Sequence, residues 1–266
     1  MRILVTNDDG IHAPGLSVLE RIAKLVAGAE GVVTVVAPES DQSGVSHSLS
    51  LNDPLRLRKI DDLHYAVKGT PTDCVTLGIH HVMKDARPEL VLSGVNRGQN
   101  VAEDVTYSGT IAAAMEGTML GIPSMALSQS YAPGGDHNSP NSVRWEVAEQ
   151  FGPDTIATIL KIGIEPGTLV NVNFPNCAPE EVTGAVATVQ GFRGANLLRI
   201  DERRDGRGNA YYWVGFARPS FDLHEGTDLH ALRQGCISVT PLKLDMTDLP
   251  NVTRFALGLS KKGLQR

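Results

Sequence analysis

The sequence is poor in cysteine and contains no long apolar run. Its three cysteines, Cys74, Cys177 and Cys236, are odd in number, widely spaced and without C-x-x-C pairing, which argues against a disulfide framework. No run of about eighteen apolar residues and no basic, apolar leader is present, so we expect neither a membrane span nor secretion. These absences favour a cytoplasmic protein with reduced thiols.

A block of basic residues is also missing. The formal charge is −6 at pH 7, and neither half of the chain carries a strong basic segment. We therefore expect neither a nucleic-acid polymer nor a membrane as a partner. A phosphate-bearing substrate would need local positive charge, which a metal ion can supply. At 266 residues with 41% hydrophobic content, the chain suffices for one large α/β domain, or one domain with an appendage.

Strands and helices are predicted to alternate along residues 1–180. Such alternation predicts an α/β fold whose mostly parallel sheet carries helices on both faces, which makes three layers, α/β/α. A capping residue, Thr72 or Asp73, is expected to begin the second helix. The predicted strands are Ile3–Val5, Val32–Val36, Pro54–Lys59, His64–Val67, Pro88–Leu92, Ser124–Ser128 and Leu169–Phe174, and the predicted helices are Leu16–Val26, Cys74–Met83, Ile111–Leu120 and Ser142–Ile162.

Residues 181–266 have a different character and are expected to form an extension of the core. Val182–Phe221 shows β-like alternation and the aromatic run Tyr211–Trp213, which predicts projecting hairpins. Thr227–Val239 is expected to return to the core. Exposed hairpins with aromatic residues can pair with a second chain or pack against other parts of the same chain. If they pair, deleting Arg193–Trp213 should lower the mass of the particle in solution.

Polar residues follow three predicted strands and are expected to meet, because parallel strands bring their carboxyl ends to one edge of a sheet. The acids Asp8 and Asp9 follow the first strand, a loop at Glu39–Ser48 holds Ser43, and a loop beginning at Ser93 holds Asn96. Two carboxylates, a hydroxyl and an amide oxygen suit Mg²⁺ or Mn²⁺ and leave positions open for water and substrate. The alternative is a solvated turn rich in Asn, Asp and Gly.

A second feature is the helix entry Ser108-Gly109-Thr110, whose N–H groups and hydroxyls can hold an anion. A metal ion beside an anion cradle predicts hydrolysis of a phosphate ester by an oriented water, with Asp8 or Asp9 accepting its proton. A covalent role for Ser43 is disfavoured, because no motif places a base beside it. The candidates for binding the phosphate are Asn7, Gly44, Asn100, Ser108, Gly109 and Thr110.

Several motifs resemble those of the SurE family of stationary-phase survival proteins, which are metal-dependent nucleoside monophosphate phosphatases. The resemblance covers nearly the whole chain. It rests on Ile3–Gly10, Val36–Pro38 followed by Gln42-Ser43-Gly44, Gly69–Cys74, Ser93–Gly98, Tyr107–Thr110 and Ser238–Leu242.

This resemblance implies a Rossmann-like core and one divalent ion per subunit, Mg²⁺ or Mn²⁺, held by residues that match Asp8, Asp9, Ser43 and Asn96. It also implies 5′-nucleotidase activity, extending to 3′-nucleotides. A projecting hairpin and a swapped C-terminal segment would build homodimers or homotetramers. The family usually has Arg where this chain has Gln42, which puts any contact made by that Arg in doubt.

Three other functional hypotheses differ in what they require. A phosphatase with an aspartyl-phosphate intermediate needs a second acid two residues after Asp8, where this chain has Gly10. A zinc deacetylase needs His at the first strand end, where Asn7 stands. A nucleotide-binding stress protein without turnover is the third.

Base recognition is assigned to loops such as Tyr131–Pro140.

Four loop residues near the predicted site have open roles. His12 and His47 are each weighed between catalysis and a surface or hydrogen-bonding role. Asp104 is a loop acid close to the predicted anion cradle, with catalytic and structural roles both possible on the sequence alone. Asp228, beside a predicted helix start at Thr227, is expected to be structural.

Overall fold

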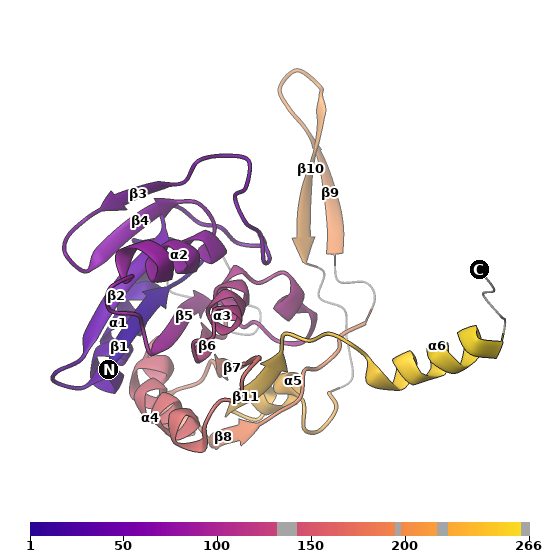
Figure 1. The fold of residues 1–266 in the computed structure, drawn as a ribbon. Coiled ribbons are helices and arrows are strands. Elements are labelled where there is room, and N and C mark those ends of the chain that lie inside the picture. The colour runs from indigo at the N-terminus through magenta and orange to yellow at the C-terminus, as the bar shows by residue number, and fades with distance from the viewer. Residues whose placement is uncertain (132–142, 195–197, 217–222, 262–266) are drawn as a thin grey trace.

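The computed structural model describes residues 1–131, 143–194, 198–216 and 223–261, and its centre is a nine-stranded sheet (Figure 1). The strand order is β3-β4-β2-β1-β5-β6-β7-β11-β8. The strands are β1 (Arg2–Thr6), β2 (Val32–Pro38), β3 (Arg56–Lys59), β4 (His64–Lys68), β5 (Leu90–Arg97), β6 (Ser124–Gln129), β7 (Thr168–Phe174), β8 (Gly184–Ala187) and β11 (Cys236–Lys243).

Strand β1 lies inside the sheet and pairs in parallel with β2 and β5. The pairs β5–β6, β6–β7 and β2–β4 are also parallel, whereas β3 and β11 run antiparallel to β4 and β7. Ile3, Leu4 and Val5 are all 0% exposed. A strand covered on both faces needs apolar side chains at every position, which explains its unbroken apolar run. The predicted mostly parallel sheet is confirmed.

Helices cover both faces of this sheet, as predicted. Side chains of Ile3 and Val5 join a core with α1 and α4, whereas Leu4 joins a core on the opposite face with α2 and α3. None of the helices in the described ranges combines the length and apolarity that crossing a membrane requires. The α-helices are α1 (Pro14–Ala27), α2 (Pro71–Leu77), α3 (Gly109–Met119), α4 (Glu146–Ile162), α5 (Asp228–Arg233) and α6 (Leu249–Lys261).

The start of α2 differs from the prediction, because neither Thr72 nor Asp73 is the cap. The Thr70 side chain accepts a hydrogen bond from the Asp73 N–H at 3.1 Å, and the Asp73 carboxylate accepts one from the Thr70 N–H at 2.8 Å. Pro71 occupies the first helical position, where its fixed φ is suitable and no N–H is needed. The helix therefore begins three residues before Cys74.

A second difference concerns Ser93, where a loop was predicted to begin. Strand β5 continues to Arg97, and its register against β6 shifts between Ser93 and Asn96. This irregularity accommodates the glycine at 94, so residues typical of a loop still form part of the ladder. Helix α4 begins at Glu146; the predicted start at Ser142, like residues 132–140 of the predicted base-recognition loop, lies outside the described residues.

Beyond residue 181 the chain both joins the sheet and leaves it. Strands β9 (Leu198–Arg204) and β10 (Ala210–Phe216) form the predicted antiparallel hairpin, which projects from the body (Figure 1). Strand β8 was expected in a hairpin but pairs with β11 in the main sheet. Strand β11, which follows α5, pairs with β7 in the main sheet, whereas α6, which was not predicted, extends away from the sheet (Figure 1).

Candidate active site

The loop that follows β1 places two carboxylates side by side. Asp8 is 4% exposed and Asp9 is partly buried. Burial, reinforced by the charge of Asp9, raises the pKa of Asp8 to about 7, although a hydrogen bond from Thr110 opposes the shift. Burial also raises the pKa of Asp9. Two acids that are costly to ionise together favour the approach of a positive charge.

Three other chain segments reach these acids, as predicted for loops at one edge of the sheet. The Gln42 N–H donates to the Asp8 carbonyl at 2.8 Å, and the Arg97 N–H donates to Asp9 Oδ2 at 3.0 Å. The Thr110 hydroxyl donates to Asp8 Oδ1 at 2.5 Å. The loops after β1 and β2, the end of β5 and the start of α3 therefore converge.

The first turn of α3 lies directly against Asp8. A Cβ atom added to Gly109 would lie 2.8 Å from the Cβ of Asp8 and 3.2 Å from its Oδ2. Ser108 caps the helix by accepting a hydrogen bond from the Ile111 N–H at 3.1 Å. Only glycine at 109 lets the N-terminus of this helix, with its partial positive charge, approach the carboxylate so closely.

The remaining predicted ligands present oxygen atoms. Asn96 donates its amide N–H to the Gly98 carbonyl at 2.8 Å, which leaves Oδ1 as an acceptor. Ser43 is exposed and donates its hydroxyl proton to Asp41 Oδ1 at 2.6 Å, which leaves oxygen lone pairs available. Asn7, which was predicted to bind the phosphate and not the metal, also has its Oδ1 buried without a hydrogen-bond partner among the described residues. Such a set of oxygens fits a hard divalent cation.

Asp41 is a charged neighbour of this site that the sequence interpretation missed. Its charge contributes to the raised pKa of both Asp8 and Asp9. It also accepts hydrogen bonds from the N–H and the hydroxyl of Ser43. The available signal was an acid two residues before Ser43 in a predicted site loop. Asp41 orients the serine and adds negative charge for a cation.

Two phosphate-binding candidates lie in different surroundings. Gly44 is exposed in the loop after β2, with φ of +77°. Asn100 is buried, and it donates its side-chain amide to Ser128 at 2.9 Å and its backbone N–H to Asn173 at 2.8 Å. Their roles in phosphate binding stay predictions.

The four residues with open roles are also placed. His12 is exposed in the turn after Gly10, and His47 contacts Glu116 at 3.0 Å. Asp104 forms an ion pair with Arg193. The buried carboxylate of Asp228 accepts backbone N–H groups, which agrees with its expected structural role.

The zinc hypothesis requires a cluster of strong ligands. Within the parts of the chain that the structure describes, no group of three or more His, Cys, Asp or Glu side chains is arranged to hold a metal ion. The predicted Mg²⁺ or Mn²⁺ set needs only two such residues, because its other ligands are a hydroxyl and an amide oxygen.

Comparison with known proteins agrees with this geometry. The family model described as "Survival protein SurE" matches residues 3–196. The chain belongs to the SurE family. The resemblance found in its motifs is thereby confirmed, together with its Rossmann-like core.

Similar proteins of this family carry the name 5′-nucleotidase SurE. One from Methylobacterium sp. (strain 4-46) is 62% identical over 97% of this chain and 100% of its own length. One from Methylorubrum extorquens (strain PA1) is 63% identical over 96% of this chain and 98% of its own. The crystal structure of the SurE protein from Aquifex aeolicus superposes with a TM-score of 0.78 at 40% identity, covering 96% of this chain and 100% of that one.

Proposed function

We propose that this chain is a metal-dependent nucleotidase that hydrolyses nucleoside 5′- and 3′-monophosphates to nucleoside and phosphate. The observation that carries the proposal is the pair Asp8 and Asp9, with the N-terminus of α3 packed against Asp8 through Gly109. Carboxylates bind a cation, and a helix N-terminus binds an anion. The names of the relatives support the same activity.

One divalent ion per subunit, Mg²⁺ or Mn²⁺, would be held by Asp8, Asp9, Ser43 and Asn96. When bound, such an ion supplies positive charge that lowers the pKa of water and neutralises phosphoryl oxygens. Thr110 holds one oxygen of Asp8 through its hydroxyl, and the Arg97 N–H holds one oxygen of Asp9. These contacts limit the orientations of both carboxylates.

The phosphate would lie at the start of α3, where backbone N–H groups and hydroxyls face negative charge. Asp8 or Asp9 accepts the proton of the attacking water as the water oxygen bonds to phosphorus and the bond from phosphorus to the ribose oxygen breaks, and the departing ribose oxygen takes up a proton from water. The residues proposed to hold the phosphate oxygens are Asn7, Gly44, Asn100, Ser108, Gly109 and Thr110.

Removal of divalent metal is expected to stop phosphate release. The measurement is inorganic phosphate liberated from a panel of nucleoside 5′- and 3′-monophosphates after treatment with EDTA, and then after addition of Mg²⁺, Mn²⁺ or Zn²⁺. Restoration by Mg²⁺ or Mn²⁺ supports the proposal, because carboxylate and amide oxygens suit these ions. Release that persists without metal contradicts it, and no release with any metal would favour the nucleotide-binding scaffold.

We also propose a cytoplasmic homodimer or homotetramer built by the hairpin and a swapped C-terminal segment. Tyr212, Trp213 and Val214 are 57–64% exposed on β10, and α6 exposes Val252 and Phe255. Apolar side chains gathered on projecting elements favour pairing with another chain. The free cysteines support a reducing compartment.

Removing either projecting element is expected to lower the number of chains in the particle. One variant replaces Leu198–Phe216 by a short Gly-Ser linker, and the other ends at Thr247. Multi-angle light scattering after size exclusion measures the mass, because loss of exposed apolar partners removes their contribution to association. Arg203→Ser, on the hairpin, is the control that keeps the wild-type mass. If both truncated variants kept the wild-type number of chains per particle, the proposal would be contradicted.

A further inference from the structure

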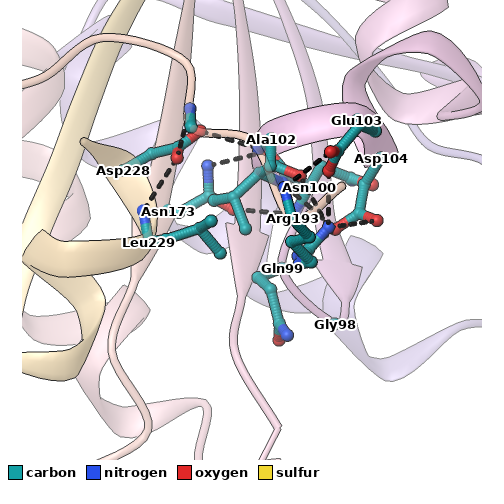
Figure 2. A network of polar contacts seen from close by, with 12 residues as sticks. Gly98, Gln99, Asn100, Ala102, Glu103, Asp104, Asn173, Arg193, Asp228 and Leu229 are labelled. Carbon is teal, nitrogen blue, oxygen red and sulfur yellow. Dashed lines mark hydrogen bonds and ion pairs between the residues drawn. The ribbon is translucent and has the colours of Figure 1, made fainter. Parts of the chain in front are cut away.

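We propose that Arg193 is a positioning residue for the phosphate site. It lies between the core and the hairpin, and through Asp104 it holds the N-terminus of α3 against Asp8. This inference rests on the proposed function, because it assigns the phosphate to the start of α3. Figure 2 shows Arg193 lying beside Glu103 and Asp104.

The first step is a bidentate ion pair. Arg193 Nη1 donates to Asp104 Oδ1 at 2.9 Å, and Nη2 donates to Oδ2 at 2.8 Å. The side chain of Arg193 is only 12% exposed, and that of Asp104 is 20% exposed. A planar guanidinium that meets both carboxylate oxygens fixes the direction as well as the distance, and limited contact with water strengthens the pair.

The backbone at Arg193 and Gly194 also binds an acid. The N–H groups of Arg193 and Gly194 donate to Glu103 Oε1 at 2.6 and 3.2 Å. Arg193 therefore contacts two successive acids: its backbone and, at 3.5 Å, its guanidinium meet Glu103, and its guanidinium also binds Asp104. These contacts join residues about ninety positions apart in the chain.

The second step runs from Asp104 to the site. The Asp104 carbonyl accepts hydrogen bonds from the N–H groups of Tyr107 and Ser108, each at 3.0 Å. Ser108 is the N-cap of α3, and Thr110 in its first turn donates to Asp8. Asp104, which binds the guanidinium, is therefore hydrogen-bonded directly to the backbone at the start of α3, where the phosphate is proposed to lie.

The same loop is held from its other side. Ala102 has φ of +51°, which is unusual for a residue with a side chain. Its N–H donates to Asp228 Oδ2 at 2.8 Å, and its carbonyl accepts from Gln190 Nε2 at 2.8 Å (Figure 2 shows the Asp228 contact). Asp228 also accepts from the Gly191 N–H at 2.8 Å. Segments from both ends of the hairpin thus secure residues 102–104.

Glu103, Asp104 and Arg193 form a partly buried charge cluster beside the site. Ion pairs of limited exposure add little net stability relative to apolar packing, and in some proteins they serve to specify one geometry. A helix N-terminus that must meet both a carboxylate and a phosphate needs such a geometry. The predicted catalytic alternative for Asp104 is replaced by a positioning role, because both of its carboxylate oxygens bind Arg193.

The test compares Arg193→Ala, Arg193→Lys and Asp104→Asn with the full-length wild type in Mn²⁺. Arg199→Ala is the matched control, because Arg199 forms an ion pair with Asp201 on the hairpin and its side chain is 63% exposed. The readouts are kcat and KM for a nucleoside 5′-monophosphate, the Kd for inorganic phosphate by calorimetry, and Tm.

We expect kcat to fall about 100-fold in Arg193→Ala, since small displacements of catalytic groups cost that much. The Kd for inorganic phosphate should rise about tenfold, which a loss of stability alone would not cause in the folded fraction. Arg193→Lys should recover part of kcat through one contact with Asp104. Asp104→Asn, which keeps its shape, should lose about tenfold in kcat and covers the case in which Arg193→Ala fails to fold.

Wild-type values of kcat and phosphate Kd in folded Asp104→Asn and Arg193→Lys would overturn the inference, whatever their Tm. The proposed function fails separately. If the wild type binds phosphate but releases none from any nucleotide, the phosphate Kd of the variants still decides the role of Arg193. A wild type that binds no phosphate would overturn both.

Discussion

Asp8→Asn is expected to abolish phosphate release and at the same time to stabilise the metal-free protein. Turnover should fall by about a thousandfold or more, because the variant loses a ligand charge and one of the two proposed proton acceptors. The fold should be retained, since an amide has nearly the shape of a carboxylate and its oxygen can still accept the hydrogen bond from Thr110.

The stability gain follows from the raised pKa of Asp8. Folding raises this pKa from its ordinary value of 3.8 to about 7, so the folded state binds the proton more tightly than the unfolded state. The metal-free wild type therefore loses stability as the pH rises from about 4 to about 7. A shift of this size corresponds to about 4 kcal/mol at pH 8. The variant carries no such penalty.

Thermal unfolding from pH 5 to pH 8, with EDTA and with Mn²⁺, measures both parts of this prediction. In EDTA the Tm of Asp8→Asn should exceed that of wild type at pH 8, and the difference should narrow toward pH 5. Added Mn²⁺ should raise the Tm of wild type far more than that of the variant. Asp62→Asn, at an exposed surface pair with Lys59, is the control. If Asp8→Asn kept wild-type turnover, Asp8 would have no part in the proposed catalytic site.

Gly109→Ala is expected to cost nearly as much activity through a single methyl group. The new Cβ would lie 2.8 Å from the Cβ of Asp8 and 3.2 Å from Cγ of Pro71. Either the first turn of α3 or the loop after β1 must then move. Overpacking of this kind destabilises by about 1–3 kcal/mol. A displaced Asp8 and phosphate site should lower kcat about 100-fold.

Steady-state kinetics and Tm separate these two effects. Gly206→Ala is a matched control, because Gly206 is exposed in the hairpin turn and an added Cβ would meet nothing within 4 Å. The control should keep wild-type kcat and Tm. If Gly109→Ala folds and retains wild-type kcat, close approach of α3 to Asp8 is not needed for turnover.

Local patterns explain why much of the fold was predictable. An apolar run that stops at polar residues located β1 and the acids after it, and helical spacing located α1 and α3 within a few residues. One error lay where tertiary pairing overrides local preference, and the other where a local capping signal was missed. Pairing with β6 extends β5 through a Gly-containing segment, and Thr70, not Thr72 or Asp73, caps α2.

The sequence by itself determined which oxygen-bearing residues lie at or beyond the carboxyl ends of the strands, and therefore the expected chemistry of Asp8, Asp9 and Asn96. Only the tertiary structure decided their partners. The Thr110 hydroxyl reaches Asp8 across 102 residues, and Arg193 reaches Asp104 across 89. Such contacts depend on sheet register and on how α3 packs against the sheet. These follow from burial of the whole core, which no short stretch of sequence encodes.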